Sequence, residues 1–152
     1  MKQTSFYYND SDAPKPNKPN HVGTCILIVA KEKILLDHRM DCDFWGLIGG
    51  ALELDETFLN GIKREVAEET NIILDDEQIK FFKIYDDPSR IIAYPDGNIV
   101  RSITISFIAK LNFIPKLKCS EESRELRFFS KDEIDSISIA KTHQQILKDY
   151  YL

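Results

Sequence analysis

The hydrophobic pattern along the chain predicts more strands than helices. Residues 25–30 are apolar throughout, which is typical of a strand buried on both faces, and residues 34–36 form the returning strand. Further strands are expected at 79–85, 91–94, 99–111 and 125–129, and helices at about 57–70, at a capping box over 130–133 and from about 139. These elements do not alternate as successive βαβ units. The pattern therefore predicts an α/β fold with a mixed β-sheet covered by helices.

The first 20 residues differ in composition from the rest of the chain. They are polar and contain Pro14, Pro16 and Pro19, which favour an extended, polyproline-like strap. We therefore expect ordered structure to begin at His21, with a strap at 1–20 and a single domain at 21–152. The aromatic residues of this strap, Phe6, Tyr7 and Tyr8, are a reasonable interface element for a possible homodimer.

Composition and charge narrow the function classes. The 152 residues carry 20 Lys and Arg against 25 Asp and Glu, a net charge of −5, which disfavours binding along a nucleic-acid backbone. No apolar run approaches the ~20 residues of a membrane span, and the N-terminus lacks the apolar region of a secretory signal. The three cysteines lie far apart with no CxxC spacing, and their odd number without a secretory signal indicates reduced thiols. We expect a cytoplasmic protein that does not bind membranes.

The helix predicted at 57–70 places acidic residues beside its apolar face rather than opposite to it. At about 100° per residue, one stripe holds Phe58, Leu59, Ile62 and Val66. Glu65, Glu68 and Glu69 border this stripe, with Glu69 inside its edge. Gly61 lies among them, and we expect it to leave open space above the acidic patch.

This arrangement is costly for the isolated helix. Glu65 and Glu69 form a like-charge i,i+4 pair, which costs about 0.2–0.5 kcal/mol. Glu68 and Glu69 also lie in the last turn, where the helix dipole disfavours each anion by about 0.3–1 kcal/mol. A solvated acidic face is one explanation, and a bound divalent cation, which removes these penalties, is the other. Because the segment holds no His or Cys, its oxygens favour Mg²⁺ or Mn²⁺ over zinc.

The spacing of these residues resembles the Nudix hydrolase box, G-x5-E-x7-R-E-U-x-E-E-x-G-U, where U is a bulky aliphatic residue. The matching positions are Gly50, Glu56, Arg64-Glu65-Val66, Glu68-Glu69 and Asn71-Ile72. Asn71 replaces the last glycine, and asparagine is the residue that best substitutes for glycine at a left-handed helix end. Upstream, residues 45–50 resemble the W-x-L-P-G-G approach of the family, with Ile48 in place of proline, and Asp55 stands where glycine is common.

The resemblance implies an α/β/α sandwich that hydrolyses a nucleoside diphosphate linked to another group, with Mg²⁺ as cofactor and Mn²⁺ as a possible substitute. By the family pattern, Glu65 and Glu69 ligate the cation, Glu68 is a further ligand or base, and a backbone carbonyl of Gly49 or Gly50 completes the shell. The pattern also pairs Arg64 with Glu56, which holds the loop and the helix in register and is equally an ordinary stabilising ion pair.

Residues outside the box are weaker candidates. Glu122 precedes the strand at 125–129 and resembles a loop residue that serves as general base in some family members. Glu53 is a candidate ligand through water, and Arg39 and Arg101 are candidate substrate contacts, although each is also an ordinary surface residue. Tyr94 is a candidate for stacking on a base or for simple packing.

Three function classes remain at this point. The first is a Mg²⁺-dependent pyrophosphohydrolase of a small-molecule nucleotide, such as ADP-ribose, another nucleotide sugar or a nucleoside triphosphate. The second is a non-catalytic nucleotide-binding or regulatory domain of the same fold. The intact Glu65, Glu68 and Glu69 favour the enzyme. An interaction module with a fortuitous acidic helix does not explain the like-charge cluster.

Overall fold

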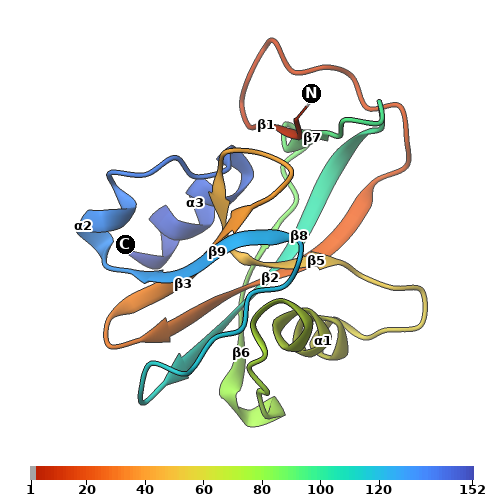
Figure 1. Ribbon diagram of the computed structural model, residues 1–152. Coiled ribbons are helices and arrows are strands. Elements are labelled where there is room, and N and C mark those ends of the chain that lie inside the picture. The colour runs from red at the N-terminus through yellow and green to blue at the C-terminus, as the bar shows by residue number, and fades with distance from the viewer. Residues whose placement is uncertain (1–2) are drawn as a thin grey trace.

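The computed structural model describes residues 3–152 as a curled sheet between helices (Figure 1). The helices are α1 (Phe58–Thr70), α2 (Lys131–Ile134) and α3 (Lys141–Tyr150), with a 3₁₀ turn at Asp76–Gln78. The strands are β1 (Ser5–Tyr7), β2 (His21–Ala30), β3 (Lys33–Arg39), β4 (Trp45–Gly46), β5 (Ile48–Ala51), β6 (Ile79–Tyr85), β7 (Ile91–Ala93), β8 (Ile99–Leu111) and β9 (Ser123–Phe129).

Within the described residues the strands form one nine-stranded mixed sheet in the order β1-β7-β8-β2-β3-β4, with β5 paired to β2, β6 to β8 and β9 to β3. The β2–β8 pair is parallel and the other pairs are antiparallel. The β2–β8 register runs from His21 beside Ser102 to Ala30 beside Leu111. This long pairing explains why β2 begins at His21, before the apolar run that predicted it.

Helices cover both faces of the sheet, as the expected α/β/α sandwich requires. Ile62 and Val66 of α1 pack in one core with Ile26 and Ile28 of β2. Cys25 and Leu27 of the same strand pack on the other face, in the core that also holds Ile134 of α2 together with Ile146 and Leu147 of α3. Because alternate residues of a strand face opposite sides, the uninterrupted apolar run of β2 serves both cores, as predicted. In the described part of the chain, no helix is long and apolar enough to cross a membrane.

The N-terminal segment departs from expectation, because order begins before His21. β1 pairs with β7, with Phe6 opposite Ile92, and Phe6 is buried beside Phe44. The proline-rich stretch has no helix or strand, but Asn17 attaches it to the β7–β8 hairpin by accepting from the Ile99 amide at 2.9 Å. Local composition predicted the extended form, but the pairing with β7 depends on a distant strand.

The ends of α1 follow the sequence signals closely. The Thr57 hydroxyl accepts from the Asn60 amide at 3.1 Å, and Asn71 caps the other end in a left-handed conformation with φ 66°. Two expectations for this helix are wrong. Phe58 is 42% exposed, because the buried face of the helix begins only at Gly61. The space above Gly61 is filled, since a Cβ there would lie 2.9 Å from Cδ1 of Leu52.

Candidate active site

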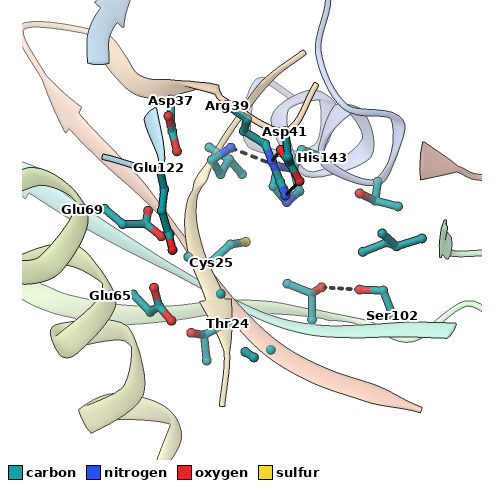
Figure 2. Close-up of a pocket in the computed structure, with 18 of the residues that line it drawn as sticks. Thr24, Cys25, Asp37, Arg39, Asp41, Glu65, Glu69, Ser102, Glu122 and His143 are labelled. Atoms are coloured by element: carbon teal, nitrogen blue, oxygen red, sulfur yellow. Dashed lines mark hydrogen bonds and ion pairs between the residues drawn. The ribbon is translucent and has the colours of Figure 1, made fainter. Parts of the chain in front are cut away.

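A cavity of about 630 Å³ opens beside the C-terminal half of α1, between this helix and the strands. Its lining residues include five acids, Asp37, Glu65, Glu69, Glu121 and Glu122, four hydroxyl residues, Thr24, Ser102, Thr104 and Thr142, and also Phe6, Arg39, Ile92, Tyr94 and His143. Figure 2 shows Glu65 and Glu69 on one side of the cavity and Arg39, Asp41 and Ser102 on the other. The cavity therefore has an acidic end and a mixed end.

The acidic end is built on one face of α1. Glu69 is only 9% exposed, and burial together with the neighbouring Glu65 carboxyl raises the pKa of Glu69 well above its usual range. Burial also raises the pKa of Glu65. Within the described residues Glu69 has no ion-pair partner. The two carboxyls thus carry the desolvation cost that the helix pattern predicted.

The backbone of β5 lies directly against these carboxyls. A Cβ on Gly50 would lie 2.5 Å from Oε1 of Glu65, and one on Gly49 would lie 2.0 Å from the Thr24 carbonyl oxygen. Pairing of β5 with β2 fixes this position, with Gly49 opposite Cys25 and Gly50 opposite Thr24. A side chain at position 50 would collide with Glu65 of the helix, and one at position 49 would collide with the backbone of β2. The absence of a side chain at Gly50 therefore lets the β5 backbone lie against the Glu65 carboxyl.

Arg64 joins the loop before α1 to the acidic face. Its Nε and Nη2 donate to both carboxylate oxygens of Glu56, at 2.6 and 2.8 Å, as the resemblance implies. Its Nη1 donates to Glu65 at 3.1 Å and to Glu68 at 3.2 Å. The hydrogen bonds from Arg64 lower the pKa of Glu56 to about 2. Arg64, which does not itself line the cavity, thus fixes the orientation of Glu65.

Two further candidate acids, Glu68 and Glu53, lie beside Arg64 and outside the cavity lining. Glu68 is 59% exposed at its side chain and lies against Arg64. Glu53 is also exposed and lies 3.7 Å from Nε of Arg64. Neither residue lines the cavity.

The donor set suits a hard divalent cation. Among residues 3–152, no group of three or more His, Cys, Asp or Glu side chains is already arranged to hold a metal ion. Among these residues the buried Glu69 carboxyl has no positive partner and the partly buried Glu65 carboxyl has only Arg64, and the β5 backbone lies within reach of Glu65. Carboxylate and carbonyl oxygens are the ligands that Mg²⁺ and Mn²⁺ prefer.

Two further carboxylates approach the acidic end from the opposite side. Glu122 lines the cavity together with Glu69, and both are labelled in Figure 2. Asp37 of β3, which sequence reasoning missed, is 8% exposed, and its Oδ1 has no hydrogen-bond partner among residues 3–152. Its charge contributes to the raised pKa of Glu69. The available signal was a carboxylate directly after the apolar run at 34–36, on the same face of the strand as Leu35.

Of the two arginines predicted to contact the substrate, Arg39 and Arg101, only Arg39 lines the cavity. Arg39 lines the cavity and forms an ion pair with Asp41, with Nη2 to Oδ2 at 2.7 Å. Arg101 does not line the cavity, and its guanidinium donates to the Asp86 carbonyl. Its neighbour Ser102 does line the cavity, because successive strand residues point to opposite faces. The structure therefore does not bring Arg101 together with the other predicted residues.

The buried Arg90 and the partly buried His143 support the mixed end. Arg90 is 1% exposed and donates to the Ser102 carbonyl, the Thr142 carbonyl and the Thr104 hydroxyl. His143 of α3 lines the cavity, and its Nδ1 accepts from the Leu47 amide at 2.9 Å. Burial lowers the pKa of His143 to about 3, so the imidazole is neutral. The sequence around His143 shows no ligand spacing that would have predicted its place in the cavity wall.

Comparison with known proteins agrees with this geometry. A family model described as NUDIX domain matches residues 19–150. An ADP-ribose pyrophosphatase of Methanocaldococcus jannaschii is 33% identical over 129 residues, which cover 82% of this chain and 69% of that protein. A MutT-like protein of Streptomyces ambofaciens is 40% identical over 63 residues, which cover 40% of this chain and 41% of that protein.

Solved structures show the same fold. A bifunctional NMN adenylyltransferase/ADP ribose pyrophosphatase of Francisella tularensis, complexed with AMP and a Mn ion, matches with a TM-score of 0.72 and 28% identity. The match covers 88% of this chain but only 42% of that one. The NUDIX domain of NrtR from Shewanella oneidensis, complexed with ADP ribose, matches with a TM-score of 0.72 and 18% identity over 93% of this chain and 92% of that one. The chain therefore belongs to the Nudix family of pyrophosphate hydrolases.

Proposed function

We propose that the chain hydrolyses the pyrophosphate bond of a nucleoside diphosphate linked to a sugar, with ADP-ribose as the first substrate to test. The observation that carries this proposal is a pair of neighbouring carboxyls, the buried Glu69 and the partly buried Glu65, beside the Gly49–Gly50 backbone at one end of the cavity. The Methanocaldococcus relative, described as an ADP-ribose pyrophosphatase, supports the substrate class.

Mg²⁺, or Mn²⁺ in its place, is the proposed cofactor. Glu65 and Glu69 would hold it, with a carbonyl of Gly49 or Gly50. Glu68, which shares Nη1 of Arg64 with Glu65, would be a further ligand at the edge of the site. Such an ion supplies charge neutralisation of the diphosphate and a lower pKa for the water that attacks phosphorus. The manganese ion in the Francisella structure supports this choice of chemistry.

The protein's own side chains complete the proposed mechanism. Arg64 fixes the position of Glu65 through its hydrogen bond at 3.1 Å. Glu122 takes the proton of the attacking water, since it lines the cavity from the side opposite α1 and forms no ion pair within the described chain. Arg39 lies at the mixed end, where it can contact the second half of the diphosphate.

The test is an assay of ADP-ribose and a panel of other nucleoside diphosphate derivatives, with Mg²⁺, with Mn²⁺ and with EDTA. We expect AMP and ribose 5-phosphate from ADP-ribose, loss of activity in EDTA, and a fall in kcat of at least about a hundredfold for Glu69→Gln and about tenfold or more for Glu122→Gln. Glu77→Gln, which changes an exposed acid in the 3₁₀ turn, is the matched control and should match the wild type.

Two outcomes would contradict the proposal. Hydrolysis that survives Glu69→Gln would place the chemistry elsewhere. Nucleotide binding without turnover of any compound would instead support the non-catalytic nucleotide-binding domain.

A further inference from the structure

The N-terminal strand forms part of the wall of the cavity, although it precedes the 19–150 region that the family model matches. Phe6 of β1 lines the cavity together with Ile92 of β7 and Tyr94, which follows β7. Phe6 lies opposite Ile92 in the β1–β7 pair, so the two strands present one apolar surface. This surface belongs to strands β1 and β7, whereas the paired carboxyls belong to α1.

The same strand segment holds Arg39 in place. Thr4 is buried, its hydroxyl donates to Oδ2 of Asp41 at 2.6 Å, and its amide donates to the Asp41 carbonyl at 3.1 Å. Asp41 in turn accepts from Nε and Nη2 of Arg39, both at 2.7 Å. The Phe6 ring centroid lies 5.1 Å from Cζ of Arg39, within the range of a cation–π contact.

These contacts leave one end of the guanidinium available. Nε and Nη2 donate to Asp41, whereas Nη1 has no hydrogen-bond partner in the described part of the chain and can donate to an anionic oxygen in the cavity. The orientation of Nη1 follows from the Asp41 carboxylate and from the ring beneath the guanidinium. Both of these contacts depend on residues 4–6, and neither involves the acidic helix.

The apolar surface beside Arg39 fits a flat ring. Ile92 and Tyr94 are each half-buried, so part of each side chain remains open to the cavity. Aromatic and aliphatic side chains bind nucleobases by stacking, and this contact accepts any base because every base has a π-face. The mixed end of the cavity thus combines a cation with a surface suited to a base.

We propose that Thr4 and Phe6 are positioning residues of the substrate site, which direct Arg39 toward the diphosphate, and that the Ile92–Tyr94 surface receives the nucleobase. This inference rests on the proposed function for the identity of the substrate. It assigns to the N-terminal strand a role in binding that is separate from the metal-binding chemistry on α1.

The test compares two substitutions on the same three-residue strand. Tyr7 is next to Phe6, points to the other face and does not line the cavity. We expect Phe6→Leu to raise the KM for ADP-ribose and the Kd for AMP, measured by calorimetry with Mn²⁺, by about tenfold, with kcat within about twofold. Tyr7→Leu should leave all three values near those of the wild type.

Thr4 provides a second, independent comparison. Thr4→Val removes the hydroxyl that donates to Asp41 and keeps the shape of the side chain, so we expect the same rise in KM and Kd. Thr4→Ser restores the hydroxyl and should restore both values. The thermal midpoint of each variant is measured in parallel, because a purely structural role would change the midpoint alone.

The outcomes separate this inference from the proposed function. If Phe6→Leu and Thr4→Val lower the thermal midpoint while KM and Kd match those of Tyr7→Leu, the strand is only structural and the inference is wrong. If the wild type binds AMP but hydrolyses nothing, the proposed function fails and the binding comparison still decides this inference. If the wild type does not bind AMP, the nucleobase surface is wrong whatever the hydrolysis assay gives.

Discussion

Glu69 is the residue at which stability and function are most directly opposed. Its carboxyl is 9% exposed and its pKa is raised by burial and by Glu65. Because the folded protein holds this proton more tightly than the unfolded chain does, folding stability falls as the pH rises above the unfolded pKa of about 4.3 toward the folded value. Without a cation, the wild-type protein therefore carries a penalty at pH 8 that it lacks at pH 4.5.

Replacing Glu69 with Gln removes this penalty and keeps the size of the side chain. In EDTA at pH 8, we expect Glu69→Gln to be more stable than the wild type by about 1 kcal/mol or more, which raises the thermal midpoint by about 2–4 °C. Added Mn²⁺ should raise the midpoint of the wild type and leave that of the variant unchanged. Thermal unfolding by circular dichroism measures both, with Glu77→Gln as control, and an equal response to Mn²⁺ in the two proteins would contradict the assignment of Glu69 as a ligand.

At the scale of single elements, most of the structure follows from local signals. The strands at 79–85 and 99–111 and the capping box at Ser130 lie where the pattern predicts them, because alternation and caps depend on neighbouring residues. Glu65 and Glu69 were found for the same reason, since one helix turn brings them together. Asp37 and His143 were missed because they come from β3 and α3, and their approach to the cavity depends on strand order, which local pattern does not specify.

The C-terminal end of α1 gives an element-scale prediction. Asn71 has φ 66°, and its amide donates to the Ala67 carbonyl at 3.0 Å. Residues with a Cβ lose about 1–2 kcal/mol in this left-handed conformation, and glycine and asparagine lose least. We expect Asn71→Ala to lower the free energy of unfolding by about 1 kcal/mol and Asn71→Gly to leave it unchanged or slightly higher, measured by urea unfolding. Equal stability of the two variants would show that the backbone conformation at this position costs little.

At the scale of the whole molecule, the cavity exists because distant parts of the chain pack around it. α1 supplies the paired carboxyls, β3 supplies Asp37 and Arg39, and α3 supplies His143 from the other side of the sheet. His143 connects these layers, because its Nδ1 accepts from the amide of Leu47, in the short link between β4 and β5. The position of β5, and with it the glycine pair, therefore depends on a neutral imidazole in the last helix.

This dependence predicts a change of stability with pH that belongs to the fold as a whole. Burial lowers the pKa of His143 to about 3, whereas its unfolded value is about 6.5. The unfolded chain binds the proton first, so stability is full above pH 6.5 and falls as the pH decreases toward 3, by at most about 1.4 kcal/mol per pH unit.

The variant His143→Asn tests this dependence, because asparagine keeps an acceptor for the Leu47 amide but does not titrate. We expect the variant to be less stable than the wild type at pH 7.5, because it loses the packing of the imidazole ring. Between pH 7.5 and 4.5, however, we expect the variant to lose less stability than the wild type does. Urea unfolding at the two pH values gives the change in the free energy of unfolding for each protein. The contributions of the other titrating groups cancel when the two changes are subtracted. Parallel losses in the two proteins would mean that the imidazole is not held neutral by the fold, and that the link between α3 and β5 does not depend on its charge.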